Sequence, residues 1–171
     1  MKSALLSAAF VAMVISPIAA QSNENNRSGG VGHEAREREL AFQLAPIKTA
    51  GHLQQYLARS LNRDSPLRFL SPGARQRFIQ SLVFTDKGLA SFDYRDLRVE
   101  LSATQAYQLL SLFGAQRSTR AIPGLQATTA TDATIMWNGG DGVIGDYPDY
   151  WCESKATCRP STGAICIGGN C

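Results

Sequence analysis

"CESKATCRPSTGAICIGGNC", residues 152–171, contains all four cysteines of the 171-residue chain. Cys152, Cys158, Cys166 and Cys171 are separated by five, seven and four residues, whereas zinc sites and thiol redox motifs use close C-x2-C pairs. An even number of cysteines in a short, glycine-containing stretch is typical of disulfides formed in an oxidising compartment. We therefore expect two disulfides, and neither a metal site nor a cofactor.

The turn sequence RPSTG at residues 159–163 favours one of the three connectivities that four cysteines allow. A hairpin folded there brings Cys158 opposite Cys166, and Cys152 to within one residue of Cys171. A bulge at Gly168-Gly169 would place the outer pair on one face. The sequence thus predicts a nested pairing, Cys158–Cys166 inside Cys152–Cys171, with the sequential pairing Cys152–Cys158 and Cys166–Cys171 as its rival.

The first twenty residues, MKSALLSAAFVAMVISPIAA, have the layout of a secretory signal peptide. Lys2 supplies a positive charge, Ala4–Ile15 form an apolar run too short for a comfortable membrane span, and Ala20 occupies the cleavage position. We expect a mature chain that begins at Gln21, is secreted or periplasmic, and has no membrane span.

Composition divides the mature chain into four segments. Residues 21–39 carry Val31 as their only large apolar side chain, so a flexible tail is predicted. Residues 40–116 form the predicted helical domain, and the Thr- and Ala-rich residues 117–136 the predicted linker. Residues 137–171 form the predicted cystine-rich C-terminal module.

The fold class that follows is mainly α, with about three helices and then a short, disulfide-stapled, glycine-rich module that could hold a β-hairpin. Apolar spacing at 3.6 residues and capping residues place the helices in the stretches 49–62, 70–84 and 101–114. The turn signal Asp86-Lys87-Gly88 precedes an apolar segment that could be a short strand over 97–101 or irregular. The helical domain is expected to unfold cooperatively without the module.

Charge is unevenly distributed, but it does not indicate nucleic-acid binding. Residues 21–120 carry fourteen Lys or Arg against nine acidic residues, a net charge of +5, whereas residues 121–171 carry two against five, a net charge of −3. Neither half approaches the basic density of a nucleic-acid-binding domain. We expect no nucleic-acid partner.

No set of residues predicts catalysis. The two histidines are His33, in the predicted tail, and His52, in the first turn of a predicted helix, and no G-x-S-x-G motif accompanies them. The candidate acids Asp93, Asp96 and Glu100 alternate with arginines, which is typical of a salt-bridged surface. A small secreted hydrolase that uses His52 or these acids is the second alternative to the hypothesis below.

A glycine-rich acidic loop follows the predicted linker. Asn138, Asp141, Asp146 and Asp149 offer oxygen ligands, but their order is not that of a calcium-binding EF-hand loop. The ordinary interpretation is a solvated loop whose glycines permit turns.

Four aromatic residues, Trp137, Tyr147, Tyr150 and Trp151, fall within fifteen positions beside the cysteines. They either pack on the helical domain or form an exposed recognition patch. The leading hypothesis is a non-enzymatic protein whose aromatic, acidic C-terminal module binds an extracellular or periplasmic protein or ligand. The first alternative is a precursor whose cystine peptide is released after the basic sequence Arg117-Ser118-Thr119-Arg120.

Overall fold

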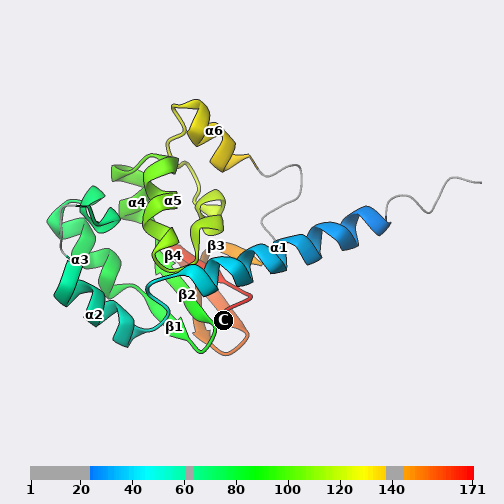
Figure 1. Cartoon of the computed structure of the whole chain (residues 1–171), viewed down its shortest axis with the longest axis horizontal. Helices are drawn as coiled ribbons and strands as arrows, with labels where there is room; N and C mark the ends of the chain where they lie inside the picture. The colour runs from blue at the N-terminus through cyan, green and yellow to red at the C-terminus, as the bar shows by residue number, and fades with distance from the viewer. Residues whose placement is uncertain (1–23, 61–63, 138–144) are drawn as a thin grey trace, which may run out of the picture.

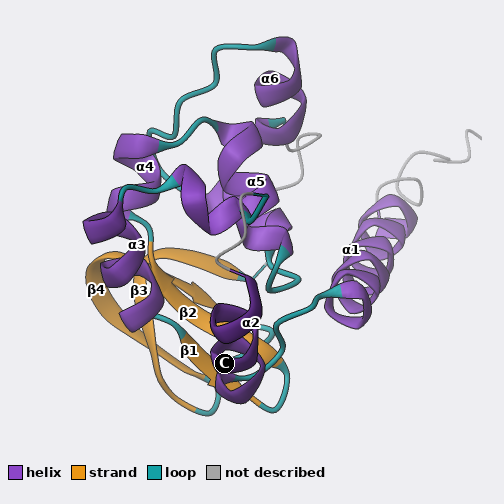
Figure 2. Cartoon of the chain, turned by 60° about the vertical axis from the view of Figure 1, so that its left-hand side comes forward, coloured by secondary structure: helices purple, strands orange, loops and turns teal. Residues whose placement is uncertain are grey.

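The computed structural model describes residues 24–60, 64–137 and 145–171, which fold into helices packed on an antiparallel sheet (Figures 1 and 2). The helices are α1 (Glu24–Leu44), α2 (Ala50–Ser60), α3 (Pro72–Gln80), α4 (Arg95–Glu100), α5 (Ala103–Ser111) and α6 (Ala130–Met136). Two 3₁₀ turns are η1 (Pro66–Phe69) and η2 (Gln116–Ala121). The strands are β1 (Val83–Thr85), β2 (Gly88–Asp93), β3 (Asp146–Ser154) and β4 (Thr157–Ile167).

The sheet joins two parts of the chain that are far apart in sequence. Its strand order is β1-β2-β4-β3, so the central strands β2 and β4 come from opposite sides of the predicted linker. The Ser91 hydroxyl donates a hydrogen bond to the Ile165 carbonyl at 2.8 Å, and the Tyr94 amide donates to the Gly163 carbonyl at 2.8 Å. The predicted helical domain and the predicted module therefore share one sheet.

Successive residues of β4 face two different apolar clusters, because side chains alternate along a strand. Ile165 and Ile167 are buried in the main core, which the helices cover (Figure 2). Cys166 faces the opposite side and belongs to a second, smaller cluster made of Ala90, Cys152, Cys166 and Cys171. With both faces covered, β2 is buried at Gly88, Leu89, Ala90, Ser91 and Phe92 instead of alternating.

Three phenylalanines from separate elements meet in the main core. Phe78 of α3 packs edge-on against Phe92 of β2 and against Phe113 after α5, with ring centroids 6.2 and 6.1 Å apart. Each such edge contact adds about 0.5–1.5 kcal/mol beyond the burial of apolar surface. The rings thus connect the helical layer to the sheet.

The helix ends are set by capping residues that the sequence identifies. Ser71 caps α3 with Pro72 at its first turn, and Ser102 and Gln105 form a capping box at the start of α5. Gly114 follows α5 with a φ of +68°, and a side chain there would lie 2.9 Å from the backbone of α1. Glycine is therefore needed at this position for both conformation and close approach.

Asp132 attaches α6 to α5. Its carboxylate accepts hydrogen bonds from the amide and hydroxyl of Thr104, at 2.8 and 2.7 Å, and from the hydroxyl of Thr129 at 2.8 Å. These bonds, above all that from the Thr104 hydroxyl, hold the pKa of the Asp132 carboxyl well below its usual range. Residues 117–136, for which the sequence predicts a linker, thus contain η2 and a docked helix.

Strands β3 and β4 form a hairpin, but its turn is not at RPSTG. Ser154 pairs with Thr157, so the chain reverses at Lys155-Ala156, where Ala156 takes a φ of +58°. The RPSTG segment, residues 159–163, instead lies within β4, which it bends back on itself.

The bend in β4 produces the pairing that the sequence predicts. Cys158 and Cys166 belong to the same strand, yet their Cα atoms lie 6.0 Å apart and they form a disulfide. Cys152 of β3 forms the outer disulfide with Cys171. Gly163 carries the positive φ, +90°, that the bend requires.

The prediction of a mainly α fold with an appended module is wrong. The helical periodicity is real, but β1 and β2 lie between the predicted helices and pair with the C-terminal strands to make a four-stranded sheet. The proposed strand over 97–101 is also wrong, since Arg95–Glu100 form α4. Burial on both faces removes the alternation that would have marked β2.

Helix α1 projects from the rest of the molecule (Figure 1). It covers residues 24–39, for which the sequence predicts a flexible tail, and it ends at Leu44, just before Pro46. The predicted signal peptide, residues 1–20, and the processing residues Ala20 and Gln21 lie outside the described ranges.

Over residues 24–60, 64–137 and 145–171, every helix is too short or too polar to span a bilayer.

A chain that ends at Gln116 should unfold without a cooperative transition, contrary to the expectation from sequence. It loses β3, β4 and the buried side chains of Ile122, Ile165 and Ile167, which leaves one hydrogen-bonding edge of β2 unpaired. Thermal denaturation followed by circular dichroism tests this expectation. A chain that begins at Gly32 retains the whole sheet and is the control. A sharp transition in the chain ending at Gln116 would contradict the shared core.

Candidate functional site

The candidate site is a pair of exposed tyrosines on the edge strand β3. Tyr147 and Tyr150 are 49% and 39% exposed, and their rings meet edge to face with centroids 6.2 Å apart. Pro148 between them is also exposed. We call these three residues the aromatic patch.

A bulge at Asp149 puts the two tyrosines on the same side of the strand. Residues three positions apart in a regular strand point to opposite faces. Here the register shifts between Pro148 and Tyr150, and Asp149 takes a φ of +63°, so Tyr150 returns to the side of Tyr147. The aromatic patch therefore exists because the strand is irregular.

Two hydrogen bonds hold the bulge in place. The Asp149 Oδ1 atom accepts from the Gly163 amide at 2.8 Å and from the Tyr94 hydroxyl at 2.7 Å. These bonds lower the pKa of the Asp149 carboxyl, the one from the Gly163 amide most strongly. Burial, together with the bond to Asp149, raises the pKa of the Tyr94 hydroxyl. The bend of β4 and the bulge of β3 thus fix one another.

The Tyr147 ring lies against the backbone after β4. A Cβ atom at Gly168 would come within 2.7 Å of Tyr147 Cε2 and 2.8 Å of the Gly145 carbonyl oxygen. Only glycine leaves room for the ring in this position.

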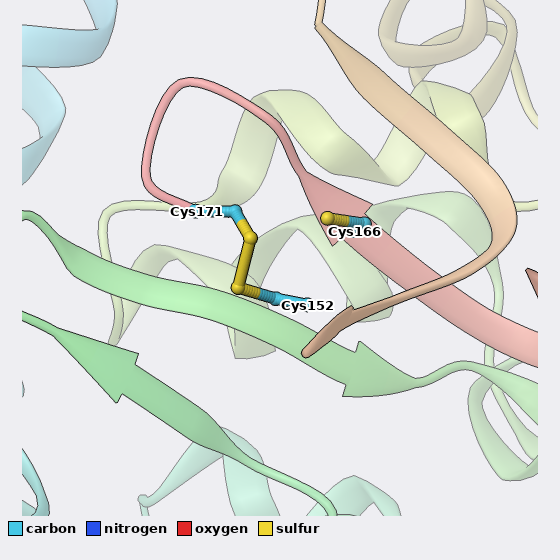
Figure 3. Close-up of side chains that lie close together, drawn as sticks. All are labelled: Cys152, Cys166 and Cys171. Atoms are coloured by element: carbon cyan, nitrogen blue, oxygen red, sulfur yellow. A yellow bond between two sulfur atoms is a disulfide. The ribbon is translucent and has the colours of Figure 1, made fainter. Parts of the chain in front are cut away.

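The two disulfides lie beside the aromatic patch, since Cys152 follows Tyr150 by two residues in β3 and Cys166 of β4 pairs with Tyr147. Figure 3 shows the Cys152–Cys171 bond with Cys166 beside it. The sulfur atoms of these three residues lie within 4.8 Å of one another, as metal-binding thiols do, but all of them are in disulfides and carry no thiolate. The disulfides act here as cross-links that keep the hairpin bent.

The start of β3 is fixed by a chain of ion pairs to α1. Asp146 is buried and accepts two hydrogen bonds from Arg38, at 3.1 and 3.0 Å. Arg38 also donates to Glu34 at 3.0 Å, and Glu34 in turn pairs with Arg117 of η2. Burial raises the pKa of the Asp146 carboxyl, and the Arg38 guanidinium opposes that rise.

The two tryptophans are not part of the aromatic patch. Trp137 is 73% exposed at the C-terminal end of α6, a helix that packs on α5. Trp151 follows Tyr150 in β3, is half-buried, and pairs across the hairpin with Arg159. Of the four predicted aromatic residues, the structure brings Tyr147 and Tyr150 into contact.

The oxygen ligands considered for calcium are already engaged where the structure describes them. Asp146 is paired with Arg38, and Asp149 with Gly163 and Tyr94. Asn138 and Asp141 lie outside the described residues.

The residues considered for hydrolysis make structural contacts. His52 is exposed near the start of α2, where its Nδ1 atom accepts from the Lys48 amide at 3.4 Å. The acids are bonded as follows: Asp93 to Arg95, Asp96 to Arg77, and Glu100 to the amide and hydroxyl of Ser71. His33, on α1, is 3.8 Å from Glu37.

The cleavage sequence of the precursor alternative lies in a folded segment. Arg117 to Arg120 belong to η2, where Ser118 and Thr119 are fully buried and Arg117 is paired with Glu34. A protease needs an exposed, extendable chain. Release of the C-terminal peptide would also remove β4 from the centre of the sheet.

The sequence identifies Asp146 and Asp149 as possible calcium ligands but does not predict the contacts through which they shape the site. Asp149 carried one signal, since aspartate is enriched among non-glycine residues with positive φ. Arg38 and Asp146 are 108 positions apart and carried none.

No protein-family model, curated protein or solved structure matches the chain.

Replacing Arg38 with Met should destabilise the protein by about 3 kcal/mol, because it leaves the buried Asp146 carboxylate unpaired. Arg36 on the same helix is exposed, and Arg36→Met should change the free energy of unfolding by less than about 0.5 kcal/mol. Urea denaturation of both variants measures the difference. Equal effects would show that the ion pairs to α1 do not stabilise the fold.

The low pKa of Asp149 predicts acid sensitivity. The pKa of the Asp149 carboxyl is lower in the folded than in the unfolded chain, so the ionised carboxylate stabilises the fold. This stabilisation is present above the ordinary carboxyl pKa of about 4 and is lost as the pH falls through the folded-state pKa. Asp149→Asn keeps an acceptor oxygen and tolerates positive φ, but it cannot be protonated in this range. Its melting temperature should therefore fall less between about pH 5 and about pH 2 than that of the unsubstituted chain. Parallel melting curves against pH would contradict this assignment.

Proposed function

We propose that the protein is exported, to the periplasm or the exterior, and that it binds a protein partner through the aromatic patch of Tyr147, Pro148 and Tyr150. The function is binding and not catalysis. The observation that carries the proposal is an exposed tyrosine pair on a strand that its surroundings hold rigidly.

Rigid, exposed tyrosines are well suited to protein recognition. They supply large contact area at a low cost in side-chain entropy, and they combine an apolar ring with a hydrogen-bonding hydroxyl. Tyr147 rests on the Gly168 backbone and Tyr150 meets it edge-on, so both rings are ordered before a partner arrives. Order in the free protein reduces the entropy lost on binding.

Export is supported by two independent features. Residues 1–20 have the composition of a signal peptide, with Lys2 before an apolar run and Ala20 at the cleavage position. All four cysteines are paired, and paired cysteines persist in oxidising compartments.

Photo-cross-linking in the native host tests the binding proposal. The full chain is produced with p-benzoylphenylalanine in place of Tyr150 or, separately, Tyr147. Tyr107 of α5 is the matched control, since its exposure of 38% is close to that of Tyr150 at 39%. Irradiation should give a discrete protein adduct from both β3 positions and none from position 107.

Two further outcomes define the result. Asp149→Ala in the chain labelled at position 150 should lower the adduct yield, because it removes the acceptor of the two hydrogen bonds that hold the bulge. Absence of an adduct from both β3 positions, or the same adduct from position 107, would refute the proposal.

A further inference from the structure

The sulfur atoms of the two disulfides form one continuous cluster. Those of Cys152, Cys166 and Cys171 lie within 4.8 Å of one another, so Cys166 is next to a disulfide to which it does not belong (Figure 3). A thiolate at Cys166 would need only a small movement to attack that neighbouring bond.

Exposure distinguishes Cys158 from the other three cysteines. Cys152, Cys166 and Cys171 are 4%, 0% and 3% exposed, whereas Cys158 is only partly buried at the edge of the cluster. An external thiolate therefore reaches the Cys158 sulfur more readily than the others, and access decides which sulfur is attacked.

We propose that Cys158 is a modification site for a small-molecule thiol and that the cluster passes the resulting thiol inward to Cys171. In the first step the external thiolate bonds to Cys158 Sγ, the Cys158–Cys166 bond breaks, and Cys166 leaves as a thiolate. In the second step Cys166 Sγ bonds to Cys152 Sγ, the Cys152–Cys171 bond breaks, and Cys171 leaves as a thiolate.

Backbone carbonyls favour Cys171 as the final position of the free thiol at equilibrium. Its sulfur lies 3.2 Å from the Ser154 carbonyl oxygen and 3.5 Å from that of Thr157, whereas Cys152 Sγ lies 3.8 Å from Ser154. A disulfide sulfur has no proton to donate, but a thiol at Cys171 would donate to these oxygens. The proton of the external thiol thus ends on Cys171, and no electron is gained or lost overall.

A matched pair of variants tests the second step. Cys158→Ser and Cys166→Ser remove the same disulfide and leave one free thiol each. Each folded variant is unfolded in mildly acidic denaturant with excess N-ethylmaleimide, which blocks the free thiol while the low thiolate fraction slows further exchange. The remaining bonds are then reduced and alkylated with iodoacetamide, and tandem mass spectrometry locates the first label. In Cys158→Ser the label should move from Cys166 to Cys171, whereas in Cys166→Ser it should stay on Cys158.

The label position decides the outcome. A label on Cys166 in the Cys158→Ser chain would show that the exchange does not proceed to the neighbouring bond, and a label on Cys152 would show that the carbonyls do not decide where the free thiol remains. Either result would overturn the proposal.

The unsubstituted, oxidised chain gives a test that does not depend on either variant folding. Incubation with reduced glutathione should add one glutathione per chain at Cys158 and leave one free thiol at Cys171, located by the same labelling of the unfolded chain. Glutathione found on another cysteine, a maleimide label confined to Cys166, or no addition to the folded chain would contradict the proposal.

Discussion

The antiparallel pairing of β2 with β4 is the constraint on which the rest of the structure depends. These strands are the two central members of the sheet, and they come from parts of the chain with different composition. One face of β4 sends Ile165 and Ile167 into the core that the helices cover. Its other face carries Cys166, around which the disulfides pack. Without this pairing neither apolar cluster would be closed.

The candidate site is built outward from this pair of strands. The bend of β4 at Gly163 presents an amide to Asp149, and the resulting bulge places Tyr147 and Tyr150 side by side. The Tyr94 hydroxyl, directly after β2, completes the bond network. Exposed aromatic groups are costly to order on a free hairpin, so the cross-links and the bulge hold the two rings in place as well as stabilising the hairpin.

Local signals predicted much of this structure, and long-range pairing accounts for what they missed. Capping residues and apolar spacing located α3 and α5. The predicted disulfide connectivity is also confirmed, although the hairpin turns at Lys155-Ala156 and RPSTG instead bends β4. The sheet was missed because β2 is short and buried on both faces, which erases its alternation. Sequence reasoning named Tyr147 and Tyr150, but the Asp149 bulge that joins them depends on Gly163, which approaches only in the fold.

Native-state hydrogen exchange of the full, oxidised chain tests the shared core most directly. The hydrogen-bonded amides of β4 between Ala164 and Ile167 are compared with those of Leu109 and Leu110 in α5 as denaturant is added. If β2 and β4 join the two parts into one cooperative unit, both sets exchange through global unfolding, with the same free energy and the same denaturant dependence. Exchange of the β4 amides through a lower-energy opening that leaves α5 protected would contradict the account.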